Sequence, residues 1–241
     1  MVLKAVPNLS IINAVSVKGV DRRAPSVAVR QQLKSHCMPS FSAERERWNK
    51  KYRESPGSWR EPDPFLPHAF SEYIRPLFPA AGRALDLAGG TGRHAIWLAR
   101  QDWEVTLIDI ANEGLEQARQ NAGPLASRMH FIEGDLTCFS ASQMQFDVLM
   151  VFFYLERKLF PEIVKSIRPG GLLIYKTLTR AQLDLPGGPK DPAYLLEEGE
   201  LPKLVERMQI LHYSEQIEEK ATAELVARKE SGRSAVKQSL P

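Results

Sequence analysis

The chain has 241 residues, of which 43% are hydrophobic and 25% charged, and a formal net charge of +3. This length allows one globular domain with short attachments, and no apolar run approaches the roughly 20 residues that a membrane-spanning helix needs. The positive charge is concentrated in residues 1–37, which carry six basic side chains and one acidic one. Because the rest of the chain is slightly acidic, nonspecific binding to nucleic acid is not expected.

Residues 1–40 show no sustained hydrophobic periodicity, and three interpretations remain open. They are a disordered N-terminal extension, upstream sequence translated ahead of a true start at Met38, or an organellar transit peptide. The two cysteines, Cys37 and Cys138, are too few for a disulfide framework and lack the spacing of a metal site. We therefore expect no metal and a reducing, cytoplasmic setting.

The next segment predicts two helices separated by a turn. Residues 44–52 follow a charged, amphipathic pattern, and a Pro-Gly-Ser turn follows at 56–58. A proline-rich extended stretch then leads to a second predicted helix over 68–78. Residues 41–80 are thus assigned to N-terminal helices that precede the main domain.

From residue 81 onward, strand-like and helix-like segments alternate, which is typical of a parallel sheet with crossover helices. The last two strand-like runs are separated by only a short turn and predict an antiparallel pair. We expect an α/β, Rossmann-like doubly wound sheet of seven strands over 81–230, mostly parallel with an antiparallel last strand, helices on both faces, and a disordered tail over 231–241. The predicted strands are 83–87, 104–109, 130–133, 146–152, 171–177, 209–217 and 222–228, and the predicted helices are 92–100, 112–121, 158–167 and 199–207.

The first of these strands leads into the most informative motif of the chain. The strand ends on Asp86, and glycines at Gly89, Gly90 and Gly92 let the backbone turn sharply before the next helix begins. Such a turn exposes main-chain N–H groups and the positive end of the helix to a ligand. An ionised Asp86 would repel the pyrophosphate of a dinucleotide but attract the ammonium and sulfonium groups of S-adenosylmethionine. The turn therefore indicates a site for a cationic nucleoside.

Two further acids follow the ends of the next two strands. Asp109 lies 23 residues after Asp86, a spacing that matches the ribose-binding acid of nucleoside-binding α/β folds. Asp135, in Glu133-Gly-Asp135, would then face an adenine amino group. In an open parallel sheet these strand ends border the ligand site, whereas the alternative is that both acids are merely solvated loop residues.

Taken together, these motifs resemble those of the class I S-adenosylmethionine-dependent methyltransferases. Asp86-Leu-Ala-Gly-Gly-Thr-Gly92 is similar to the family's acidic glycine loop, with Ala88 where many members have glycine. Asp109 and Glu133-Gly-Asp135 match the second and third cofactor motifs. Ile167-Arg-Pro-Gly-Gly-Leu-Leu173 matches the turn before the family's fifth strand.

The segment Arg47-Trp48-Asn-Lys-Lys-Tyr-Arg53, with Trp59 beyond it, looks like the N-terminal lid of the tellurite-resistance-like and thiopurine-methyltransferase-like branches. The resemblance implies S-adenosyl-L-methionine as the cofactor, with 41–80 as lid helices. It also implies a set of cofactor-binding residues: Asp86, Ala88, Gly89, Gly90, Gly92, Asp109, Ile110, Asp135, Leu136, Trp48 and Tyr52.

In such an enzyme the cofactor provides a reactive methyl group, and the protein holds donor and acceptor in line. The acceptor would approach over the ends of the fourth and fifth strands, which makes Tyr154, Lys176 and His94 the candidate catalytic residues. Each has an ordinary structural alternative, as a wall, surface or helix residue. Whether a base is needed depends on the protonation state of the acceptor.

The acceptor is expected to be a small molecule (a thiol, a metalloid or a hydroxyl compound) and the protein a monomer. The fourth strand ends in Val151-Phe-Phe-Tyr154, without the Asn-Pro-Pro-Tyr arrangement that holds a flipped base. Nucleic-acid methylation is therefore not expected, and neither is a membrane partner. Two alternatives remain, an NAD(P)-dependent Rossmann oxidoreductase, since Gly90-Thr-Gly92-Arg-His-Ala95 also fits the dinucleotide pattern, and a non-catalytic S-adenosylmethionine-binding module.

Overall fold

The structure, a computed structural model, describes residues 41–54, 61–140, 145–205 and 207–231. The predicted N-terminal extension, Trp59 and nearly all of the predicted tail lie outside these ranges. The proposed division of the chain into domains stays a prediction.

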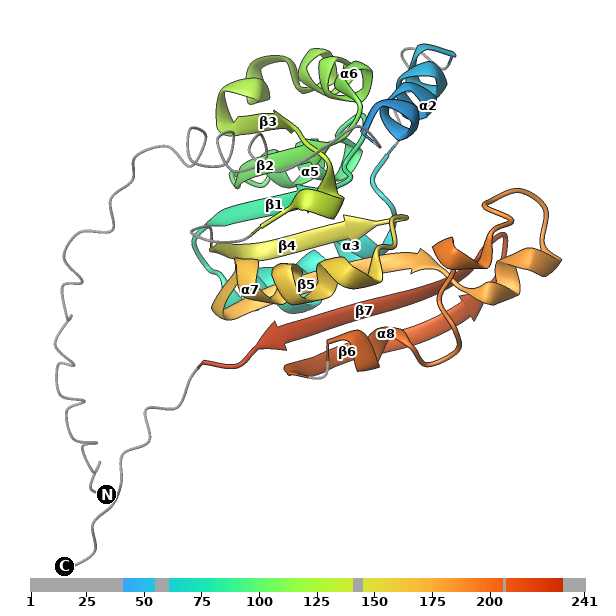
Figure 1. Cartoon of the computed structure of the whole chain (residues 1–241). Helices are drawn as coiled ribbons and strands as arrows, with labels where there is room; N and C mark the ends of the chain where they lie inside the picture. The colour runs from blue at the N-terminus through green and yellow to red at the C-terminus, as the bar shows by residue number, and fades with distance from the viewer. Residues whose placement is uncertain (1–40, 55–60, 141–144, 206, 232–241) are drawn as a thin grey trace, which may run out of the picture.

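A seven-stranded sheet with the strand order β3-β2-β1-β4-β5-β7-β6 forms the centre of the protein (Figure 1). The first five strands pair in parallel, and β7 runs antiparallel to both β5 and β6. The predicted fold class is confirmed. The strands are β1 (Arg83–Leu87), β2 (Glu104–Asp109), β3 (Met129–Glu133), β4 (Phe146–Phe152), β5 (Ile167–Leu178), β6 (Met208–Ile217) and β7 (Ala221–Lys229).

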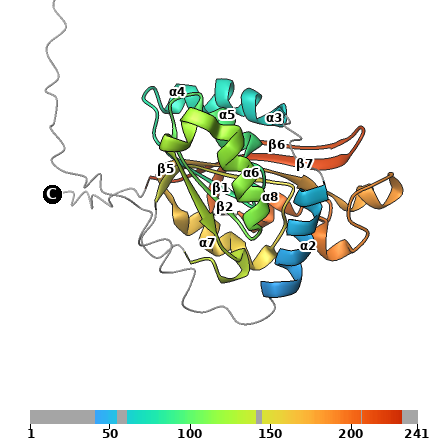
Figure 2. The same cartoon turned by 90° about the horizontal axis from the view of Figure 1, so that it is seen from above.

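The helices are α2 (Phe41–Glu54), α3 (Phe65–Ala69), the π-helical η1 (Phe70–Ile74), α4 (Arg75–Leu77), α5 (Arg93–Ala99), α6 (Asn112–Ala122), α7 (Phe160–Ser166) and α8 (Leu201–Leu204). They cover both faces of the sheet (Figure 2). Helices α3, α5 and α6 bury Phe65, Ile96 and Leu115 against one face. Helices α7 and α8 bury Phe160 and Leu201 against the other. Apolar burial on both faces explains why the parallel strands read as nearly continuous hydrophobic runs.

Two predicted helices differ from the observed ones for local reasons. The helix predicted over 68–78 starts earlier, at Phe65, because the Asp63 carboxylate accepts a hydrogen bond from the Phe65 N–H at 3.0 Å. The helix predicted over 199–207 is only one turn long, from Leu201 to Leu204. The fifth strand begins before the Pro-Gly-Gly turn, because Ile167 already pairs with Phe146, and a register shift then carries the turn between this pair and the next one, Val148 with Leu172.

The parallel strands bring their carboxyl ends to one edge of the sheet, and α2 lies across this edge (Figure 1). Polar contacts hold α2 on α6. The Asn49 side chain donates to Asn112 Oδ1 at 2.9 Å and accepts from the Glu113 N–H at 3.1 Å. Gln117 donates to the Tyr52 carbonyl at 2.9 Å. These contacts position the aromatic side chains of α2 over the strand ends.

None of the helices within the described ranges is long and apolar enough to cross a membrane. Among the same residues, no group of three or more His, Cys, Asp or Glu side chains is placed to hold a metal ion. The cytoplasmic location stays a prediction.

Candidate active site

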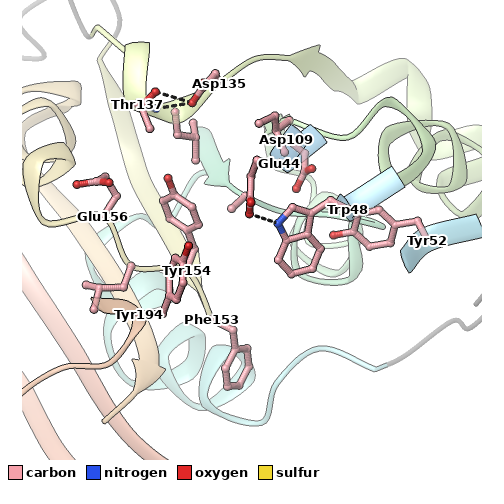
Figure 3. Close-up of a pocket in the computed structure, with 14 residues that line it drawn as sticks. Glu44, Trp48, Tyr52, Asp109, Asp135, Thr137, Phe153, Tyr154, Glu156 and Tyr194 are labelled. Carbon is pink, nitrogen blue, oxygen red and sulfur yellow. Dashed lines mark hydrogen bonds between the residues drawn. The ribbon is translucent and has the colours of Figure 1, made fainter. Parts of the chain in front are cut away.

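A pocket of about 310 Å³ lies at the carboxyl ends of the parallel strands (Figure 3). Its walls come from α2, from the segments that follow β1 to β4, and from the short helix η6 (Pro192–Tyr194). The lining residues are Glu44, Trp48, Tyr52, Ala88, Asp109, Ile110, Asp135, Leu136, Thr137, Phe153, Tyr154, Leu155, Glu156 and Tyr194.

The glycine turn after β1 is shaped by left-handed backbone conformations. Ala88, Gly90 and Gly92 have φ angles of 55°, 55° and 83°. Ala88 lines the pocket, whereas the three predicted glycines of the turn do not. A Cβ at Gly90 would lie 2.5 Å from the Tyr52 hydroxyl oxygen, so the glycine allows α2 to place this phenol directly on the turn.

Asp109 connects the end of β2 to the glycine turn. One carboxylate oxygen accepts the Gly90 N–H at 2.8 Å, and the other accepts the Ala111 N–H at 2.8 Å. Burial raises the pKa of this carboxyl to about 6, although both N–H groups act in the opposite direction. The residue is thus fixed in orientation while it lines the pocket.

Asp135 is held in a similar way at the end of β3. Its Oδ1 accepts hydrogen bonds from the Thr137 N–H and the Thr137 hydroxyl, both at 2.8 Å. These bonds begin the short helix η3 (Leu136–Cys138). Leu136 and Ile110, which follow Asp135 and Asp109 in the sequence, also line the pocket. The ends of β2 and β3 therefore each contribute an oriented acid and an apolar side chain to the lining.

Asp86 lies beneath the glycine turn and is not among the residues that line the pocket. The side chain is buried, and its Oδ2 has no hydrogen-bond partner. Burial raises its pKa to about 7, partly offset by a hydrogen bond from the Ala95 N–H. A Cβ at Gly89 would lie 2.8 Å from Asp86 Oδ2. The carboxyl therefore supports the turn from below, and its predicted contact with the cofactor stays a prediction.

Of the three candidate catalytic residues, only Tyr154 lines the pocket. Burial raises the pKa of its phenol, and the neighbouring Glu156, Asp135 and Glu44 carboxylates raise it further. Tyr154 therefore stays protonated near neutral pH and can donate a hydrogen bond.

Lys176 and His94 lie outside the pocket lining. The Lys176 ammonium forms ion pairs with Asp63 and Glu224, both at 2.8 Å, which leaves it no role as a free base. His94 is buried and stacks on Phe152 with 3.9 Å between the ring centroids, and its Nε2 has no partner. Burial lowers the pKa of this imidazole well below its usual range.

Sequence reasoning missed five of the lining side chains: Glu44, Thr137, Leu155, Glu156 and Tyr194. Glu44 lies one helical turn before Trp48 and accepts a hydrogen bond from the indole N–H at 2.8 Å. Glu156 lies two residues after Tyr154, close enough in sequence to have been considered. Tyr194 belongs to a loop whose sequence carries no signal for the pocket.

The charges of the pocket fit a cationic nucleoside. Four of the lining residues are acids, and no lysine, arginine or histidine is among the 14 described residues of the lining. Such walls disfavour a pyrophosphate and favour an ammonium or sulfonium group. The residues present therefore suit S-adenosylmethionine and do not suit a dinucleotide.

Comparison with known proteins agrees with this assignment. Residues 84–171 match a family model described as "Methyltransferase domain". Over these residues the chain is similar to methyltransferase domains. A Bacillus subtilis (strain 168) protein named as a methyltransferase, YqeM, is 30% identical over 126 residues, which are 47% of this chain and 51% of that protein. The chain spans about half the length of the curated relatives it matches.

Solved structures of methyltransferases share the fold of this domain. The magnesium protoporphyrin IX methyltransferase ChlM from Synechocystis PCC 6803, with bound SAH, superposes with a TM-score of 0.62 at 15% identity, over 79% of this chain and 100% of that chain. TehB from Haemophilus influenzae superposes with a TM-score of 0.57 at 16% identity, over 76% of this chain and 67% of that one. At these identities the similarity establishes the fold alone, and the tellurite-resistance-like branch stays a prediction.

Proposed function

We propose that the protein transfers a methyl group from S-adenosylmethionine to a small molecule by in-line displacement. The observation that carries this proposal is the pocket beside the glycine turn, where Asp109 and Asp135 are fixed in orientation and the described lining holds no cationic side chain. The methyltransferase match over residues 84–171 supports it. When bound, the cofactor supplies an electrophilic methyl group on a sulfonium.

Different residues of the pocket would bind the ribose and the adenine of the cofactor. A carboxylate has about four lone-pair sites, so Asp109 retains acceptor capacity for ribose hydroxyls after binding Gly90 and Ala111. Asp135 would accept from an adenine amino group, with Ile110 and Leu136 as the apolar walls. These roles depend on residues from three consecutive strand ends.

The other residues exclude water and orient the acceptor. Trp48 and Tyr52 of α2 cover the strand ends and limit access of solvent to the site. Tyr154, which stays protonated, would donate a hydrogen bond to the acceptor rather than remove its proton. Rate enhancement would then come mainly from holding donor and acceptor in line.

Calorimetric titration of the full chain with S-adenosylhomocysteine, with NADH in parallel, tests the proposal. We expect micromolar binding of S-adenosylhomocysteine alone. Asp109→Ala should weaken it by about 1–3 kcal/mol, or roughly fivefold to 150-fold, because buried polar groups lose a partner. Asp184→Ala, an exposed acid outside the pocket lining, is the matched control and should leave the affinity unchanged.

Other outcomes identify the alternatives. Binding of NADH in place of S-adenosylhomocysteine would favour the oxidoreductase and contradict the proposal. Unchanged affinity in Asp109→Ala would contradict the ribose assignment. Binding of S-adenosylmethionine without turnover of any thiol, hydroxyl, amine or metalloid acceptor would identify a non-catalytic binding module.

A further inference from the structure

The pocket holds more negative charge than the cofactor requires. Asp109 and Asp135 serve the cofactor in the proposed function, and each carboxylate is already fixed by N–H groups of its own loop. Glu44 and Glu156 remain, on opposite sides of the pocket, with Tyr154 between them in Figure 3. The acceptor must therefore bind in a negatively charged environment.

These two glutamates differ in how far their charge is already compensated. Glu44 accepts the Trp48 indole N–H at 2.8 Å and forms an ion pair with Arg47. Glu156 accepts only the Lys158 N–H, at 3.0 Å, and no lysine, arginine or histidine in the described part of the chain forms an ion pair with it. Glu156 is thus the acid of the pocket that retains most of its charge and acceptor capacity.

Arg157, the cationic residue next to Glu156 in the sequence, binds other groups. Its Nε and Nη2 donate to the two Glu200 carboxylate oxygens at 2.6 and 2.8 Å. Its Nη1 and Nη2 also donate to the carbonyls of Ala193 and Leu195, both at 2.9 Å. Arg157 therefore does not neutralise Glu156. Instead it holds the segment that brings Tyr194 to the pocket.

Aromatic side chains complete the environment around Glu156. Tyr154 and Tyr194 lie on its side of the pocket, and Trp48 lies across from them (Figure 3). Tyr194 is 45% exposed, which is unusual for a large aromatic residue and leaves its surface available to a ligand. Aromatic faces and carboxylates together favour organic cations, since both carry negative electrostatic potential.

We propose that the methyl acceptor is a small primary or secondary amine, and that Glu156 binds its ammonium form and removes the proton. This inference rests on the proposed methyl transfer and names the acceptor class of the same site. It replaces the expected thiol, metalloid or hydroxyl acceptor. Phosphate- and carboxylate-bearing acceptors are disfavoured because nothing in the described lining neutralises them.

The reaction balances with these groups alone. Glu156 takes a proton from R–NH₃⁺ and leaves R–NH₂ with a free lone pair. That lone pair forms the new C–N bond to the methyl group as the C–S bond breaks, and its electron pair stays on sulfur. The products are R–NH₂–CH₃⁺, S-adenosylhomocysteine and a proton that Glu156 releases to solvent.

The test is a panel of matched acceptors given to the full chain with S-adenosylmethionine. Each set has one carbon skeleton carrying an amine, a thiol, a hydroxyl or a carboxylate, such as benzylamine, benzyl mercaptan, benzyl alcohol and benzoate. Methylated product is measured by mass spectrometry. We expect turnover of amines at least tenfold above turnover of the other members. Turnover favouring any other class, or none with any amine while S-adenosylhomocysteine still binds, overturns the acceptor assignment but not the cofactor assignment.

Two variants test the role of Glu156. Glu156→Gln should lower amine turnover at pH 7 at least tenfold, with affinity for S-adenosylhomocysteine within twofold of the wild type. The defect should shrink as the pH rises toward the pKa of the amine, because more acceptor arrives already neutral. The control is Glu198→Gln, on an exposed residue outside the pocket lining, which should change neither quantity. A defect that is equal at every pH would contradict the proton-removal role.

Discussion

The two sides of the pocket are built in different ways. The side proposed to bind the cofactor comes from three consecutive strand ends, where Ala88, Asp109 and Asp135 follow one another at the same edge of the sheet. The side proposed to bind the acceptor joins α2, the segment after β4 and residue Tyr194, which lie far apart in the sequence. Strand topology fixes the first side, whereas specific polar contacts between distant segments fix the second.

The largest expected effect concerns the cofactor side, where Asp86 lies buried beneath the turn. Burial raises its pKa from 3.8 to about 7, so between these values the native state binds more protons than the unfolded state. Stability should therefore fall as the pH rises from about 4 to about 7, by about 1.4 kcal/mol per unit of pKa difference and about 4 kcal/mol at most. Asp86→Asn should remove this dependence.

Urea unfolding of the wild type and Asp86→Asn across this pH range measures the effect. Because other groups titrate in both proteins, the difference between the two curves isolates Asp86. Parallel curves would show that the carboxyl has the same pKa in both states and that it does not support the turn as a buried acid.

Gly90→Ala tests the contact between the two sides. The alanine would require a left-handed φ and would meet the Tyr52 hydroxyl at 2.5 Å, so we expect a loss of about 2–4 kcal/mol and weaker binding of S-adenosylhomocysteine. Gly187→Ala is the control, since Gly187 has φ +73° and no atom lies within 4 Å of the place where the new methyl group would be. It should cost only about 1–2 kcal/mol. Equal losses would mean that Tyr52 does not constrain the turn.

Arg157→Ala tests the acceptor side alone. Removal of the bonds to Glu200 and to two carbonyls should lower the free energy of unfolding by about 1 kcal/mol, because the arginine is partly exposed. It should also speed trypsin cleavage at Lys190 several-fold, because the segment around Tyr194 is held less firmly. Arg180→Ala removes a more exposed ion pair with Glu197 and should cost less than about 0.5 kcal/mol. Binding of S-adenosylhomocysteine should stay within twofold in both. A tenfold loss in Arg157→Ala would show that the two sides are not independent.

Ala88→Gly should have the smallest effect and the opposite sign. Ala88 has φ 55°, which costs an L-residue about 1–2 kcal/mol, while glycine loses about 0.5–1 kcal/mol to backbone entropy. The variant should gain up to about 1 kcal/mol, visible as a small rise in Tm. A fall in Tm would mean that the alanine methyl makes packing contacts that outweigh the strain.

The same contrast explains what the sequence could predict. The positions of Asp109 and Asp135 at the pocket could be predicted because parallel strands bring their carboxyl ends to one edge of the sheet, and their contacts with the cofactor stay a prediction. The whole sheet was predictable for a similar reason, since its alternating apolar segments are local in sequence. The sequence shows that Ala88 stands where glycine is common, but only the structure shows that this alanine adopts a left-handed backbone conformation.

The rest depended on contacts that no local pattern encodes. Lys176 was expected near the acceptor, yet it pairs across the sheet with Glu224 of β7 and with Asp63, 113 positions earlier in the chain. His94 follows the glycine turn directly, but it faces Phe152 in the core. Tyr194 reaches the pocket on a segment held by Arg157, which binds the carbonyls on either side of it, and by backbone bonds between Leu196 and the end of β5.

The attachment of α2 has a consequence for how such a protein diversifies. This helix is held on α6 by amide side chains, Asn49 to Asn112 and Gln117 to the Tyr52 carbonyl, and by the Tyr52 ring, which lies against Gly114. A position such as Glu44, which lines the pocket without taking part in these contacts, can therefore vary while the helix stays attached. Under the proposed function, acceptor preference can then change in small evolutionary steps while the strand ends beneath α2 are inherited unchanged.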